Sequence, residues 1–131
     1  MWRKPRAGMT PANPVWGNVV LRPGTKSYEE LKKSAPVVVE VKSFSSLLLN
    51  DDYLTYSSEI KLAKEYDNRT GKTRLLKGGV VSGNIPENFS SFASCKETQS
   101  YNRIDDGYAS GAGYKGPKYM LFRKGVTISG K

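Results

Sequence analysis

Apolar and polar positions alternate along much of this chain in the short runs that are typical of β-strands. Between residues 56 and 66 the alternation has period two, and the apolar side carries Tyr56, Ile60, Leu62 and Tyr66. Ser58 and Lys64 are polar exceptions on that side, and Ala63 falls on the opposite, polar side. Because successive side chains of a strand point to opposite faces, the pattern predicts a half-buried strand of about 11 residues.

A polar run and a second apolar run follow this strand. Gly71 lies in the polar run 67–72 and suits a turn, because glycine adopts a positive φ without a steric penalty. Residues 73–82 regain apolar character at Leu75, Leu76, Val80 and Val81, so the two runs are predicted to form a hairpin. Gly78 and Gly79 interrupt the second arm and predict a β-bulge there.

Shorter patterns predict the remaining strands and loops. Strands are predicted at 15–21, at 37–41, and as one bent or two short segments within 119–128. Residues 47–49 form an apolar patch in front of a turn at 50–52. Residues 97–118 are polar and rich in glycine, which predicts a loop.

Two short helices are predicted from their N-terminal signals. Ser27 and Glu30 have the spacing of a capping box, and Pro36 is expected to stop the helix that follows. Asn84 is expected to cap a second helix with Pro86 in its first turn. Phe89 and Phe92, three positions apart, are predicted to share the buried face of that second helix.

The sequence therefore predicts a mainly β fold of the α+β class, with an antiparallel sheet and two short helices. Residues 1–14 contain three prolines and are predicted to form an extended N-terminal segment. Residues 15–131 are predicted to form a single β-rich domain, since 131 residues suit one domain.

Charge suggests one class of partner. The 21 Lys and Arg residues exceed the 12 Asp and Glu residues, so the net charge is +9 and polyanions are attracted. The sequence has no zinc-finger spacing and no RNP-like aromatic motif. A small basic nucleic-acid-binding module therefore remains an alternative function that rests on charge.

The residue inventory limits the chemistry of this chain. It has no histidine and one cysteine, Cys95, so we predict no catalytic residue, no metal ligand and no cofactor. The carboxylate pairs at 51–52 and 105–106 are interpreted as turn residues, and the glycine-rich run 107–113 as a flexible loop. No apolar run approaches the roughly 20 residues of a membrane span, and we expect a cytoplasmic location.

Several short stretches occur in a distinctive order. They are 6–11, 18–24 followed by 27–31, 57–66 with 71–72, 77–84, 116–119 and 125–130. In this order and spacing they resemble the C-terminal domain of the TldD/PmbA family, the modulator-of-DNA-gyrase or metallopeptidase-like proteins. The resemblance spans nearly the whole chain and implies a role in proteolysis or peptide processing.

The chain departs from the metal-bearing members of that family. Those members carry an HExxxH helix upstream of the matching region and a cysteine ligand in the glycine-rich loop before the final strands. This sequence has no histidine, and its loop 105–116 has no cysteine, so no metal ligand is carried over. The resemblance implies a fragment or a partner-type subunit, with any zinc supplied by an absent segment or by a partner.

A domain of this kind is expected to expose apolar strand edges, either in the run 37–41 or in the final strand. We expect contact with a peptide or partner at Val37, Val39, Val41, Gly111, Gly113 and Tyr114. The expected partners are a metal-bearing TldD/PmbA-type subunit or a second copy of this chain. A peptide substrate is expected to add as an extended strand.

Overall fold

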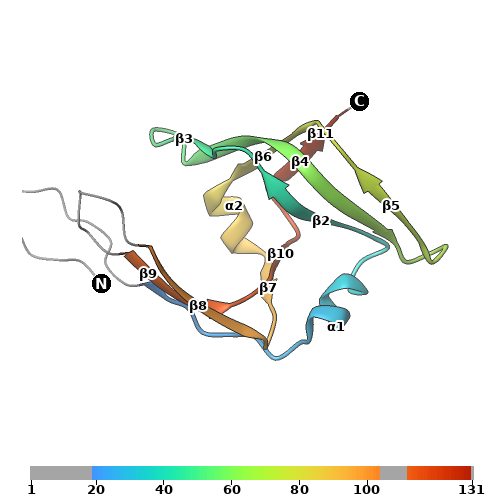
Figure 1. The fold of residues 1–131 in the computed structure, drawn as a ribbon, viewed down its shortest axis with the longest axis horizontal. Coiled ribbons are helices and arrows are strands. Elements are labelled where there is room, and N and C mark those ends of the chain that lie inside the picture. The colour runs from blue at the N-terminus through green and yellow to red at the C-terminus, as the bar shows by residue number, and fades with distance from the viewer. Residues whose placement is uncertain (1–18, 104–111, 131) are drawn as a thin grey trace, which may run out of the picture.

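The computed structural model of this protein describes residues 19–103 and 112–130 (Figure 1). Its sheets are mainly antiparallel and carry two short helices, so the predicted mainly β fold of the α+β class is confirmed. Helices α1 (Tyr28–Lys32) and α2 (Ile85–Ser90) have 5 and 6 residues, which is too short to cross a bilayer. The predicted extended segment 1–14 lies outside the described residues.

The largest sheet is a meander of three long arms. The arms are β2 (Val37–Phe44) continued by β3 (Leu48–Asn50), then β4 (Thr55–Asp67), then β5 (Lys72–Leu76) continued by β6 (Val80–Asn84). The final strand, β11 (Val126–Ser129), pairs with β6. The predicted strand 56–66 and its hairpin with the turn at 67–72 are confirmed.

An extra residue in the central strand bends this sheet. Where β2 advances one position, from Ser43 to Phe44, its partner in β4 advances two, from Leu62 to Ile60. Lys61 is therefore an extra residue of β4, and it shifts the alternation of side chains by one position. Next to it, β2 advances two positions, from Val41 to Ser43, against one in β4, so Lys42 is a compensating extra residue of β2.

The core lies at the bulge in β4 and takes residues from both sides of it. Ile60, Ala63 and Val81 are buried there. The prediction of one continuous apolar face is wrong for the second half of β4, because the extra residue Lys61 turns Ala63 inward. Tyr66 points instead to the opposite face, which α1 covers.

The predicted bulge at Gly78 and Gly79 is confirmed, because both residues face Ile60. The Gly78 N–H donates to the Ile60 carbonyl (3.1 Å), and the Ile60 N–H donates to the Gly79 carbonyl (2.9 Å). This extra residue offsets the one in β4, so β5 and β6 keep one register with β4 on both sides of the bulge. Both glycines have positive φ, at 79° and 89°. A side chain at Gly79 would also collide with the backbone carbonyl of Ser129, so glycine is required where β11 ends against the sheet.

Both helices begin as predicted. The Glu30 backbone N–H donates to Ser27 Oγ (3.2 Å) and the Ser27 N–H donates to Glu30 Oε2 (2.6 Å), which completes the capping box. In α2 the Glu87 N–H donates to Asn84 Oδ1 (3.0 Å), and a proline lies in the first turn.

The predicted buried face of α2 is wrong. Phe89 is 48% exposed, and Phe92 is 44% exposed and begins β7 (Phe92–Ser94) instead of belonging to the helix. The two rings meet edge to face at 5.3 Å between centroids. Asn88 is the buried residue of α2, because its side chain accepts a hydrogen bond from the Tyr56 hydroxyl (2.8 Å).

A second long hairpin carries most of the remaining chain. Its arms are β7 continued by β8 (Thr98–Arg103), and β9 (Ala112–Pro117) continued by β10 (Met120–Phe122). β1 (Val19–Val20) joins β9 in parallel, so the described part of the predicted strand 15–21 is only two residues long. β10 and β11 confirm two short strands within 119–128.

The prediction of a loop over 97–118 is wrong at both of its ends. β8 and β9 form there because the hydrogen bonds of an antiparallel ladder come from the backbone and do not require apolar side chains. Gly116 lies in β9 where a side chain would press against Leu21 and the ring of Tyr114. Glycine therefore permits close packing within this strand, although the glycine content of the stretch predicted a loop.

Among the described residues, no further strand pairs with either end of the largest sheet. In the strand order β11-β6-β4-β2, the outer strands are β2 and β11, so the expectation that 37–41 or the final strand forms an edge is confirmed for both. Figure 1 shows β3 and the turn after it projecting from one corner of the sheet. These edges are the features of the fold that bear most directly on function.

Candidate functional site

The outer side of β2 presents backbone groups in a regular pattern. The Asn68 N–H donates to the carbonyl of Pro36 (2.8 Å), and this pair lies in the same antiparallel register as Val37↔Asp67. Hydrogen-bonded and non-hydrogen-bonded pairs alternate along an antiparallel ladder. The backbone groups of Val38 and Glu40 therefore face β4, and those of Val37, Val39 and Val41 face outward.

This pattern forms the candidate site, which we call the β2 edge (residues 37–41). Val37 is 38% exposed, and Val39 and Val41 are half-buried. Val39 also packs against the Ile60 cluster, so its position is fixed by the core. A rigid outer strand with outward N–H and C=O groups can bind an extended chain by adding it as a further strand.

The other expected contact residues lie elsewhere. Gly113 and Tyr114 belong to β9, in the three-stranded sheet β1-β9-β8, whereas the β2 edge belongs to the largest sheet. The Tyr114 hydroxyl donates to the carbonyl of Pro117 (2.8 Å), and burial raises its pKa. Gly111 lies outside the described residues. The described residues of this expected set are therefore divided between two sheets.

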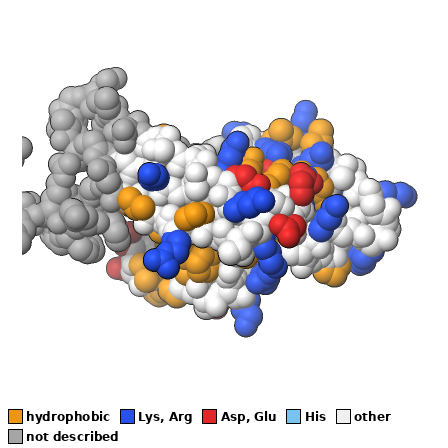
Figure 2. All heavy atoms as spheres, turned by 90° about the horizontal axis from the view of Figure 1, so that it is seen from below, with side chains coloured by type: hydrophobic (Ala, Val, Ile, Leu, Met, Phe, Trp, Pro, Cys, Tyr) orange, Lys and Arg blue, Asp and Glu red, His pale blue; other side chains and the backbone are white. Residues whose placement is uncertain are grey.

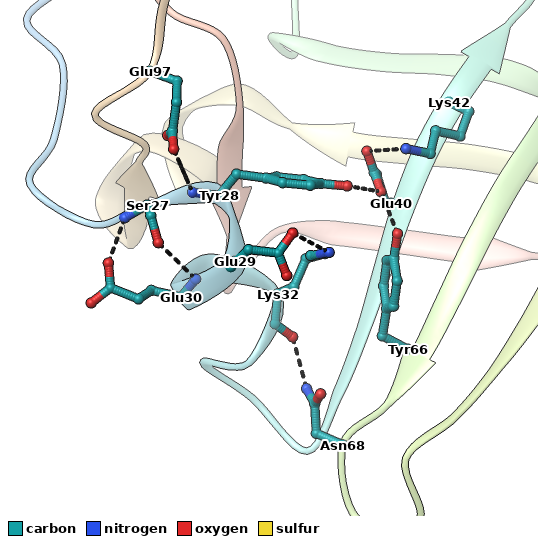
Figure 3. Close-up of polar contacts among 10 residues, drawn as sticks. All are labelled: Ser27, Tyr28, Glu29, Glu30, Lys32, Glu40, Lys42, Tyr66, Asn68 and Glu97. Atoms are coloured by element: carbon teal, nitrogen blue, oxygen red, sulfur yellow. Dashed lines mark hydrogen bonds and ion pairs between the residues drawn. The ribbon is translucent and has the colours of Figure 1, made fainter.

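A polar cluster fixes α1 against the inner face of the β2 edge (Figure 3). Glu40 Oε2 accepts hydrogen bonds from the hydroxyls of Tyr28 (2.7 Å) and Tyr66 (2.8 Å). Its other oxygen, Oε1, accepts from Lys42 Nζ at 2.6 Å. Tyr28 lies in α1 and Tyr66 in β4, so one carboxylate joins the helix to two neighbouring strands.

Both ends of α1 are tied to distant parts of the chain. At its start, the Tyr28 backbone N–H donates to the Glu97 carboxylate (3.1 Å to Oε2). After its end, Asn68 Nδ2 donates to the carbonyls of Lys32 and Ala35, at 2.7 Å each. These contacts hold the segment that leads into β2 and so set where the β2 edge begins.

The protonation states of the cluster suit binding more than proton transfer. Partial burial raises the pKa of the Glu40 carboxyl, but hydrogen bonds from Lys42, Tyr28 and Tyr66 outweigh burial and leave this pKa below its usual value. Burial, and then hydrogen bonds with Tyr28 and Glu40, raise the pKa of Tyr66 well above its usual value. At neutral pH Glu40 is therefore an acceptor and both tyrosines are donors.

Sequence reasoning missed this cluster. Its members lie 12 and 26 positions from Glu40, with no fixed motif between them. One signal was present: Glu40 interrupts the β-branched run 37–41, and a carboxylate inside an apolar strand needs hydrogen-bond donors.

An open groove of about 550 Å³ runs beside β3 and the start of α2. Its floor consists mainly of hydroxyl and amide side chains that face one another across neighbouring strands. Ser57 pairs with Ser82, and Ser82 with Thr127. Leu48, Leu49 and Glu87 also line the groove. The groove therefore offers hydrogen-bonding groups and a single carboxylate.

The turn prediction for the first carboxylate pair is confirmed, and the single cysteine belongs to the core. Asp51 and Asp52 lie in an exposed turn, and Asp105 and Asp106 lie outside the described residues. Cys95 is fully buried, and its Sγ donates to the carbonyl of Glu97 (3.2 Å). Within 19–103 and 112–130, His, Cys, Asp and Glu residues do not gather in groups of three or more that suit a metal ion.

The fold and its site define a β-rich protein whose largest sheet, in the part of the chain that the structure describes, has two edges without a further strand. Searches with protein-family models and among curated proteins gave no match to this chain. The resemblance to the TldD/PmbA family therefore rests on the sequence stretches given above.

Proposed function

We propose that this chain is a C-terminal-type domain of a TldD/PmbA-like metallopeptidase, acting in peptide processing as a partner-type subunit or as a fragment of a larger subunit. It supplies a sheet edge and no metal ligand of its own. The metal-bearing subunit provides the zinc and the hydrolysis.

The observation that carries this proposal is the β2 edge. Its outward backbone groups at Val37, Val39 and Val41 suit the addition of an extended segment, from the partner subunit or from a peptide held between the subunits. The Glu40 cluster supports this role, because it fixes the edge before binding and so reduces the conformational entropy lost on association.

The small core also supports the proposal, because a partner surface would cover apolar side chains that this chain leaves exposed. In the described ranges only seven apolar or sulfur-containing side chains are buried, and they are Leu31, Val38, Ile60, Ala63, Val81, Cys95 and Pro117. Large apolar side chains remain exposed on several strands. Exposed apolar surface of this kind is typical of a protein–protein contact.

The proposal is tested in an extract of the source cell. Immunoblotting measures the mass of the polypeptide, and size-exclusion chromatography shows the complex in which it elutes. Co-elution of a 14.5 kDa band with a larger zinc-containing subunit is expected for a partner-type subunit. A single larger band that contains this sequence is expected for a fragment. Elution as a 14.5 kDa chain alone contradicts both forms of the proposal.

A small basic nucleic-acid-binding module is the second candidate, and the net charge of +9 favours it. Lys32 lies 4.5 Å from the centroid of the Tyr28 ring, but that ring is already stacked on Tyr119 at 4.3 Å. In Figure 2, Lys and Arg side chains are spread over the visible face, with Asp and Glu between them. These features favour charge-driven binding over base stacking, so affinity for single-stranded DNA that falls steeply with salt would favour this candidate.

A further inference from the structure

The most apolar exposed segment lies apart from the β2 edge, in what we call the β3 arm (residues 44–54). Six of its side chains are between 44% and 73% exposed, and they are Phe44, Leu47, Leu48, Leu49, Tyr53 and Leu54. All belong to eleven consecutive positions. Monomeric proteins rarely expose so many large apolar side chains together, so this arm is expected to be covered by another protein surface.

The β3 arm is held in a defined shape. β3 pairs with β4 on one side, and the sheet path shows no strand on its other side among the described residues. The turn after it is fixed by the Tyr53 N–H, which donates to Asn50 Oδ1 (3.2 Å), and by the Ile85 N–H, which donates to the Leu54 carbonyl (2.9 Å). Figure 1 shows this arm projecting from the corner of the sheet, where another molecule can reach it.

We propose that β3 pairs with β3 of a second copy of this chain, in an antiparallel contact whose two-fold axis passes through Leu48. Leu47, Leu48 and Leu49 read the same in both directions. A two-fold antiparallel pairing therefore places leucine opposite leucine at all three positions, as a self-complementary interface requires.

Charge does not oppose this register although the whole chain is basic. The leucines at the centre of the contact carry no charge, so they bring no like charges together.

The area of the β3 arm suits a dimer. Six side chains with roughly 100 Å² exposed each provide on the order of 600 Å² per copy, and a standard interface buries about 800 Å² per partner. The strand backbones and the turn add to the side-chain area. The contact does not depend on the family assignment and leaves the β2 edge available.

The first test is sedimentation velocity of the purified full chain over a range of concentrations. We expect a concentration-dependent dimer, and we expect Leu48→Glu to weaken association at least tenfold, because it places two carboxylates at the two-fold axis. Leu75→Glu is the matched control: Leu75 is an exposed leucine of β5 (64%) outside the β3 arm, and its substitution should leave the dimer unchanged.

The second test does not depend on the folding of the glutamate variant. Leu48→Cys should form an intermolecular disulfide under mild oxidation, since Leu48 faces itself across the axis and the paired Cα atoms lie within about 4.4–6.8 Å. Leu75→Cys should not, and the native Cys95 is buried. The proposal is overturned if the wild type is monomeric at all concentrations, if both glutamate variants behave alike, or if Leu48→Cys forms no disulfide dimer.

Discussion

Among individual residues, Glu40 connects more of the structure than any signal in the sequence suggested. It lies in an apolar run, and the donors that permit this come from α1 and β4 (Figure 3). The carboxylate was visible in the sequence, but its partners depend on how β2 and β4 align, which a single sequence does not specify. The capping box at Ser27 was predictable because all of its atoms lie within four consecutive residues.

Tyr66→Phe tests the cluster through its pH dependence. The pKa of Tyr66 is raised in the folded protein, so the folded state keeps this proton at pH values where the unfolded chain releases it. The stabilisation is therefore complete below about pH 10 and is lost as the pH rises further. Removing the hydroxyl should cost about 1 kcal/mol of unfolding free energy at neutral pH.

Urea unfolding measured from about pH 8 to about pH 11 checks this prediction, since tyrosine titrates in that range. The wild type should lose more stability than Tyr66→Phe as the pH rises. Parallel pH profiles of the two proteins would show that Tyr66 does not stabilise the fold in this way.

Gly79→Ala tests the bulge in the third arm, which consists of β5 and β6. Alanine at a positive φ costs about 1–2 kcal/mol, and at Gly79 the new methyl group also meets the Ser129 carbonyl. Gly71→Ala is the control, because it has a positive φ of 70° and nothing within 4 Å of the added methyl group. Thermal unfolding should show a larger loss at Gly79, and equal losses would mean that the contact with β11 is unimportant.

For whole elements, the alternation of side chains predicted β4 well and the elements around it less well. The bulge at Lys61 changes which residues face the core, and it depends on the unequal advance of β2 and β4. β8 and β9 were missed because polar and glycine residues pair there through backbone groups. The β-branched residues predicted the strand at 37–41, and its place at an edge was expected from the resemblance. Gly113 and Tyr114, expected at the same site, lie in another sheet.

Val39→Pro tests the β2 edge as an element. Proline removes an N–H that faces away from β4, so the sheet should keep its internal hydrogen bonds while losing a donor for an added strand. Binding to the partner subunit in a co-purification assay should fall at least tenfold. Val39→Thr keeps the N–H and the β-branched shape, and it should bind nearly as well; equal binding by both variants would contradict strand addition at this edge.

At the scale of the whole molecule, the two outer edges of the largest sheet and the small core favour a protein that is stabilised by association. The composition, with 37% apolar and 25% charged residues, is that of an ordinary globular domain, but composition gives the amount of apolar residue and not its distribution. The structure leaves much of that apolar material on the surface, including Leu48, Leu49 and Leu75. Exposed leucines on edge strands contribute little to the stability of the isolated chain.

We therefore expect the isolated chain at low concentration to have an unfolding free energy below about 5 kcal/mol, the lower end for natural domains. Its urea midpoint should rise with protein concentration, because association stabilises only the folded state. Urea unfolding at several protein concentrations measures both quantities. A concentration-independent midpoint with a free energy above about 8 kcal/mol would indicate a self-sufficient monomer.

The most direct measurement is amide hydrogen exchange along the β2 edge, resolved by residue, for the chain alone and in complex with its partner subunit. In the free chain, Val38 and Glu40 should exchange slowly and Val37, Val39 and Val41 quickly, because only the first two amides face β4. In the complex all five should exchange slowly. If Val37, Val39 and Val41 still exchange quickly in the complex, the partner does not add a strand at this edge.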